Sequence, residues 1–189
     1  MQDNATIVKA TDALKKDHRI IEKVLGVLEK INADPASAQC ETWKSVLDFI
    51  RNFADRSHHL KEEKVLFPAL QERGVPRDGG PIGCMLAEHE EGRSYVRAMF
   101  DALDQWEKGG GNFQAQLEEN AGAYLRLLPG HILKEDEILF EMAEEALGPE
   151  DQKGLLRKFE EYEAEELGAG FQEKYIRLAE ELERSAGNK

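Results

Sequence analysis

Histidine and glutamate occur four residues apart at two places in the sequence, His58 with Glu62 and His131 with Glu135. Both pairs belong to a repeated pattern, HxxKExxxLF. On an α-helix, residues i and i+4 lie on one face, so the imidazole and the carboxylate of each pair can meet at one point. Imidazole nitrogen and carboxylate oxygen are ligands for iron, manganese or zinc. The repeat therefore predicts two halves of a metal site.

A further histidine precedes each pair by a similar length of chain. His18 lies ahead of the first pair and His89 ahead of the second, and each directly follows an acidic residue. We interpret the chain as two helical hairpins of like design. Each hairpin supplies one isolated histidine and then a histidine–glutamate pair.

The elements that carry these residues are predicted to be amphipathic helices. Apolar residues recur at steps of three and four, and glycine and proline gather at a few points between these stretches, as is typical of helices joined by loops. We expect four long helices, over residues 6–31, 37–73, 81–108 and 112–147. Gly148 followed by Pro149 ends the last of these and starts a fifth helix, which is expected to bend around residues 168–170.

Short loops between long helices imply antiparallel neighbours. We therefore predict an all-α fold, an up-down-up-down four-helix bundle with an additional C-terminal helix. Residues 1–148 would form the bundle, and residues 149–189 would pack on it or on a second chain. In such a bundle the second and fourth helices run parallel, so that their histidine–glutamate pairs face each other.

His18 and His89 would close the other two sides of this site. Polar groups buried together without a partner are costly, so a set of four imidazoles and two carboxylates pointing inward predicts a metal. Two carboxylates also suit two metals, because each carboxylate has two oxygens with which to bridge them.

The composition excludes some other classes of function. Acidic residues number 38 against 25 basic ones, a net charge of −13, which argues against nucleic acid and anionic membrane as partners. No stretch approaches the roughly 18–20 apolar residues needed to span a bilayer, and the first residues lack the layout of a secretory signal. Cys40 and Cys84 are far apart, so we expect reduced thiols in a cytoplasmic protein.

Four segments together resemble the hemerythrin family, specifically the bacterial hemerythrin-like proteins with an HHE cation-binding domain. They are DH at residues 17–18, HHxKEExxLFP from residue 58, EHEEGR from residue 88 and HIxKEDxxLF from residue 131. The likeness covers about residues 10 to 147. It implies a four-helix bundle around a non-haem di-iron centre, that is, two iron ions, with O2 or an oxo or hydroxo bridge as exogenous ligand.

By this resemblance, the imidazole ligands are His18, His58, His89 and His131, and the carboxylates that bridge the two irons are Glu62 and Glu135. The oxygen-carrying hemerythrins use five histidines, two of them four residues apart on the third helix. The residues four positions from His89 are Met85 and Arg93, which are not ligands of that kind.

His59 is predicted to supply the missing donor as a seventh ligand, with an outer position or a surface role as the alternative. A different register would pair His59 with Glu63, which also lies four residues on. The alignment of the two repeats favours the pairing of His58 with Glu62, and it leaves Glu63 on the surface.

Three acidic residues next to the expected ligands are candidates for orienting imidazoles through hydrogen bonds: Asp17, Glu88 and Asp136. Pro129, just ahead of His131, is expected to kink the last long helix. Gly92 is a candidate for leaving room beside the metals, with close packing of helices as the alternative.

The donor set favours binding over catalysis. Ferritin-like di-iron enzymes use ExxH pairs and more carboxylates, and this chain lacks those pairs around its histidines. We expect a protein that binds O2, NO or peroxide in sensing, delivery or stress response, with no catalytic residue assigned. The alternatives are a di-iron enzyme that decomposes peroxide or handles NO, and a metal-stabilised interaction protein that dimerises through its C-terminal helix.

Overall fold

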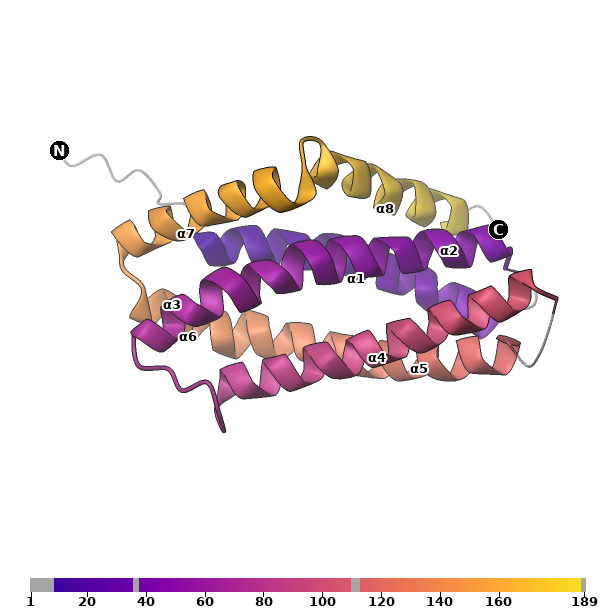
Figure 1. Ribbon diagram of the computed structural model, residues 1–189, viewed down its shortest axis with the longest axis horizontal. Helices are drawn as coiled ribbons and strands as arrows, with labels where there is room; N and C mark the ends of the chain where they lie inside the picture. Colours follow the sequence, from indigo (N-terminus) through magenta and orange to yellow (C-terminus); the bar gives the residue numbers. More distant parts are fainter. Residues whose placement is uncertain (1–8, 36–37, 110–112, 188–189) are drawn as a thin grey trace.

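The computed structural model describes residues 9–35, 38–109 and 113–187. All regular secondary structure in these ranges is helical, which confirms the prediction of an all-α chain. The helices lie lengthwise along one another (Figure 1).

The first half of the chain forms two rods. Helix α1 (Ala10–Ala33) is the first. The second is continuous from residue 40 to residue 72, and includes α2 (Cys40–Phe49), the π-helical stretches η1 (Ile50–His59) and η2 (Glu62–Leu66), and α3 (Phe67–Glu72). The expected helix over residues 37–73 is thus present, but with wider turns in its middle.

The second half repeats this plan. Helix α4 (Pro81–Glu107) is followed by a rod that runs from residue 113 to residue 146. That rod comprises α5 (Phe113–Lys134), the π-helical turn η3 (Glu135–Leu139) and α6 (Phe140–Ala146). Helix α5 continues through Pro129 without interruption.

The C-terminal segment is folded against the same chain. It consists of α7 (Pro149–Tyr162), the π-helical turn η4 (Glu163–Leu167) and α8 (Phe171–Gly187). Gly168 and Gly170 adopt positive φ values of 89° and 78°, a conformation open to glycine, and they separate η4 from α8. Helix α7 packs on α1 and η2, and α8 on α1 and α2, so the segment covers one side of the molecule (Figure 1).

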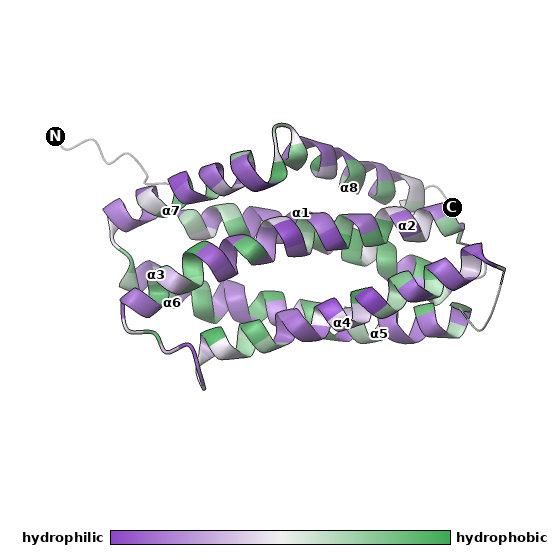
Figure 2. Ribbon diagram, in the orientation of Figure 1, coloured by the Kyte–Doolittle hydropathy of each residue, from purple (hydrophilic) through white to green (hydrophobic). Residues whose placement is uncertain are grey.

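Two apolar clusters fill the interior, one towards each end of the rods. Apolar and polar positions alternate around each helix (Figure 2), and the apolar ones face inward. Along α1, for example, Leu14 belongs to one cluster and Ile21 to the other, with His18 between them. The same order recurs on the other three rods, so a layer of polar side chains crosses the molecule between its two apolar halves.

None of the described helices is both long enough and apolar enough to cross a membrane.

Substitution in either apolar cluster should destabilise the fold. Leu47 is fully buried in the cluster that includes Trp43, so Leu47→Ala should lower the free energy of unfolding by about 2–5 kcal/mol. Leu133 is 54% exposed, and Leu133→Ala should change it by no more than about 0.5 kcal/mol. Urea denaturation of both variants measures the difference, and equal effects would contradict the assignment of the core.

Candidate metal centre

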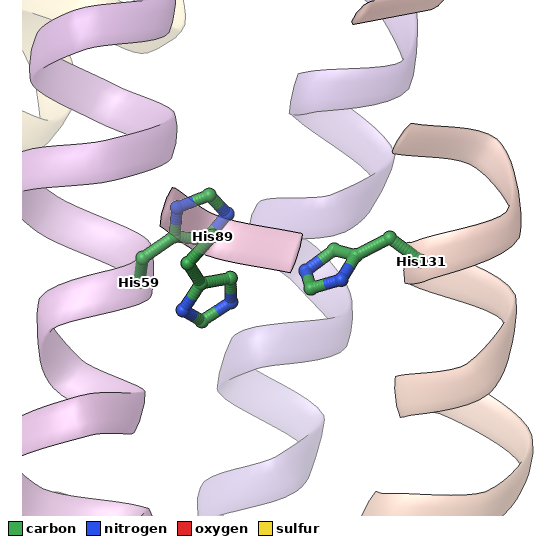
Figure 3. Close-up of side chains that lie close together, drawn as sticks. All are labelled: His59, His89 and His131. Carbon is green, nitrogen blue, oxygen red and sulfur yellow. The ribbon is translucent and has the colours of Figure 1, made fainter. Parts of the chain in front are cut away.

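All five histidines of the chain and two glutamates lie in the polar layer. Each of these seven side chains is buried, with exposed fractions between 0 and 6%. The imidazole rings of His59, His89 and His131 point towards one another from η1, α4 and α5 (Figure 3). The potential ligand atoms form two groups, within each of which they lie no more than 4.8 Å apart: His59, His89 and His131 in one, and His18, His58, Glu62 and Glu135 in the other.

The two glutamates lie between these groups. Glu62 Oε1 is 3.6 Å from His58 Nε2, and Glu62 Oε2 is 3.6 Å from His89 Nε2. Glu135 Oε2 is 3.2 Å from His18 Nε2 and 3.4 Å from His131 Nε2. Its second oxygen, Oε1, is 3.7 Å from His89 Nε2. Both carboxylates therefore have oxygens near imidazoles of both groups.

The inward atoms of this cluster lack hydrogen bonds of acceptable geometry within the described chain. They are Nε2 of His18, His58, His89 and His131 and both carboxylate oxygens of Glu62 and Glu135. Leaving these eight buried polar atoms unpaired would cost on the order of 10 kcal/mol in total, at about 1–3 kcal/mol each. Cations among them would satisfy these lone pairs, and a mixed nitrogen and oxygen set suits a first-row transition metal. The residues present thus fit a metal centre.

The charges of the two glutamates are unequally stabilised. Burial and the neighbouring charge of Glu135 raise the pKa of Glu62 well above its usual value. Burial also disfavours ionisation of Glu135, but the nearby imidazoles of His131, His18 and His89 hold its pKa well below the usual value. Two carboxylates in one buried site are difficult to ionise together. Positive charge between them would remove that conflict.

The opposite edge of every imidazole, its Nδ1 atom, faces a carboxylate. In three cases the distance is that of a hydrogen bond: 2.7 Å from His18 to Asp136, 2.8 Å from His89 to Glu63 and 2.9 Å from His131 to Glu88. The other two pairs are looser, at 3.6 Å from His58 to Asp17 and 3.5 Å from His59 to Asp55. A carboxylate at Nδ1 favours the tautomer with its proton there, which leaves the Nε2 lone pair free to face inward.

Four of these contacts link neighbouring rods in a closed ring. Asp17 of α1 faces His58 of the second rod, whose Glu63 faces His89 of α4. Glu88 of α4 then faces His131 of the fourth rod, whose Asp136 faces His18 of α1. Each orienting carboxylate directly adjoins, in sequence, one of the seven central residues. Its partner imidazole, however, is on the next rod.

Each of these carboxylates also forms an ion pair with a basic side chain. Arg19 pairs with Asp136, Lys134 with Glu88, and Lys61 with Asp17, while Arg93 reaches both Glu63 and Asp55. Burial opposes the ionisation of all five carboxyl groups, yet the imidazoles and cations beside them outweigh it and lower their pKa values, to about 2 for Asp55. The carboxylates therefore stay ionised and remain acceptors for Nδ1–H.

Several of these partners differ from the sequence predictions. Glu63, expected on the surface, is largely buried and accepts a hydrogen bond from His89. His59, predicted as a seventh ligand, is buried in the three-histidine group, so the alternative of a surface role is wrong. Asp55 and Arg93 were missed, although each lies four residues from a histidine on the same helix, at the spacing that places them on one face. Lys61 is the lysine of the HxxKExxxLF pattern, as Lys134 is in its second copy, but no role was predicted for it.

The two halves of the repeat also share a local distortion. The π-helical turns η2 and η3 begin at Glu62 and Glu135 and end at Leu66 and Leu139, the equivalent positions of the pattern. Single π-helical turns of this kind occur frequently at functional sites. Both buried glutamates therefore stand at the start of a widened turn.

A cavity of about 330 Å³ reaches the three-histidine group from the surface between η1 and α4. Its lining includes His59, Gly92 and Tyr124. A Cβ atom at Gly92 would lie 3.4 Å from the Tyr124 ring, so α4 and α5 pack closely at this glycine. Of the seven central residues, only His59 lines this cavity.

The metal-free chain should lose stability at alkaline pH. Burial lowers the pKa of His18, but its hydrogen bond to Asp136 and the nearby carboxylate of Glu135 outweigh that and raise it to about 9 from 6.5. The folded chain thus holds this proton more tightly than the unfolded chain, a stabilisation present below pH 6.5 and lost as the pH rises through 9. The loss amounts to about 3 kcal/mol at most.

Urea denaturation in the presence of a chelator, at several values between pH 6 and pH 10, measures this loss. His18→Gln removes the titrating group and should flatten the decline. An equally steep decline in His18→Gln would show that His18 is not its source.

Comparison with known families finds one match, to the hemerythrin HHE cation-binding domain, over residues 9–143. The comparisons with curated proteins and with solved structures returned no significant match. The matched range contains all seven central residues and all five orienting carboxylates. Because it spans well over half of the chain, the chain belongs to the hemerythrin HHE cation-binding family.

Proposed function

We propose that this protein holds two iron ions in the polar layer and binds O2, or a related small ligand such as NO or peroxide, at that centre. The observation that carries this proposal is the placement of Glu62 and Glu135, whose oxygens lie near imidazoles of both ligand groups. Carboxylates placed in this way are suited to bridge two cations.

The proposed ligands divide unevenly. His59, His89 and His131 would hold one ion, His18 and His58 would hold the other, and Glu62 and Glu135 would contribute to both. His59 thus takes the place of the histidine that is missing from the third helix. We assign the bundle, in up-down-up-down order, to residues 1–148 and the C-terminal segment to residues 149–189.

When bound, such a pair of irons supplies Lewis acidity and electrons for a diatomic ligand. The side chains of the protein would determine the environment of the ions. The orienting carboxylates keep protons at Nδ1 so that Nε2 lone pairs face the ions, and the buried cluster excludes bulk water. The cavity lined by His59 and Gly92 would admit small molecules. Because imidazoles outnumber carboxylates among the ligands, the centre favours reversible binding over oxidation of an organic substrate.

The proposal predicts a reversible spectroscopic response. Loading the metal-free protein with Fe²⁺ under anaerobic conditions should give close to two irons per chain, and O2 should change the absorption spectrum. Removal of O2 should restore the original spectrum. Steady release of O2 from added peroxide would instead support the enzymatic alternative, and loaded iron that does not respond to O2, NO or peroxide would contradict the proposed ligand binding.

Removal of a bridging carboxylate should disrupt the two-metal site. Glu62→Ala is expected to lower the iron content to one ion per chain or fewer, because both groups lose an oxygen ligand. His131→Ala should have a similar effect on the three-histidine group. Glu137→Ala, on the exposed side of the fourth rod, is the matched control and should bind iron as the wild type does. Metal analysis after desalting measures the content, and full content in Glu62→Ala would contradict the bridging role.

A further inference from the structure

Lys61 is a buried cation shared between the bundle and the C-terminal segment. It is only 3% exposed, and its Nζ lies 2.9 Å from Asp17 Oδ2 and 2.8 Å from Glu163 Oε1. Asp17 Oδ2 in turn is 3.6 Å from His58 Nδ1. A continuous line of charged contacts therefore runs from η4 of the C-terminal segment to an imidazole of the central cluster.

The same part of the C-terminal segment also contacts the backbone and side chains just ahead of His58. The Tyr162 hydroxyl donates to the Arg56 carbonyl at 2.7 Å, and the Arg56 guanidinium donates to the Glu166 carbonyl at 2.9 Å. Gln172 donates from Nε2 both to Ser57 Oγ, at 3.0 Å, and to Glu163 Oε1, at 2.8 Å. Glu163 is thus held in place by a second partner besides Lys61.

The ion pair between Lys61 and Asp17 differs from the ion pairs of the other three carboxylates in the ring. Lys61 also binds Glu163, which lies beyond residue 143, where the family match ends. The Asp17–His58 contact is also the longest of the four in the ring. The least tightly oriented imidazole of the ring is therefore the one whose support depends on the C-terminal segment.

We propose that Lys61 and Glu163 are positioning residues for His58, through which the C-terminal segment sets the affinity of the ion bound by His18 and His58. The inference rests on the proposed function in taking His58 as a ligand. Glu163 holds Lys61 beside Asp17, and Lys61 keeps Asp17 ionised where it faces His58. Without Glu163, Lys61 loses its second anchor, so Asp17 and the imidazole of His58 are less firmly placed.

The test uses Co²⁺ alone, a metal whose visible absorption reports its ligands, titrated into the full-length metal-free chain. Glu163→Gln removes the charge of a partly exposed side chain while keeping its shape. We expect the first Co²⁺ to bind as in the wild type and the second about 10-fold more weakly, the scale on which loss of a partner behind a metal ligand acts. The absorption bands that grow with the second equivalent should shift as well.

Two further variants and a control sharpen the test. Lys61→Met should weaken the second site at least as much, and Lys61→Arg, which keeps the cation, should restore it. If Lys61→Met fails to fold, Glu163→Gln remains decisive. The control, Glu183→Gln, breaks a different contact of the C-terminal segment, the exposed pair with Lys23 at 3.3 Å, and should bind both ions normally.

Wild-type affinity and an unchanged spectrum for both Co²⁺ ions in Glu163→Gln would overturn the positioning role while leaving the metal centre intact. Equal weakening in Glu163→Gln and Glu183→Gln would overturn it too, because the effect would then come from general packing. A wild-type chain that takes up no Co²⁺ and no iron would instead overturn the proposed function.

Discussion

The structure depends on the cost of burying polar groups that have no partner. Four rods meet along two apolar clusters, and between these clusters seven polar side chains are almost fully withdrawn from water. Their inward atoms lack hydrogen bonds within the described chain. Packing of the apolar clusters forces these atoms together, and positive charge among them relieves the conflict between the two buried carboxylates. Fold stability and metal binding are therefore coupled at one layer of the molecule.

The carboxylates at the Nδ1 atoms fix the orientation of the buried imidazoles. An imidazole can turn about its side-chain bonds, and its proton can sit on either nitrogen. A carboxylate at Nδ1 restricts both, and the cation behind it keeps that carboxylate ionised. Arg93 serves two such carboxylates at once, Glu63 and Asp55. The ligand arrangement thus depends on charged pairs that reach from the buried layer to the protein surface.

Much of the centre could be predicted from local spacing. The repeat around His58 and His131 predicted which histidines and glutamates would meet in the buried cluster, because helical neighbours at i and i+4 share a face whatever the rest of the fold does. Which carboxylate orients which imidazole could not be derived in this way. Glu63 adjoins Glu62 in sequence but contacts His89 on another rod, so its role depends on the distance and rotation between helices. Lys61 was missed for the same reason, since its partners come from α1 and η4.

The closed ring of carboxylate–imidazole contacts has a consequence for assembly. Every rod both gives an orienting group to the next and receives one from the previous, so no helical hairpin can pre-form its half of the centre in the final geometry. High-affinity metal uptake should then appear only after all four rods have docked, as a single late event in folding. Bound metal would report completion of the tertiary structure, and an exchange of ligand residues on one rod would require compensating changes on its neighbours.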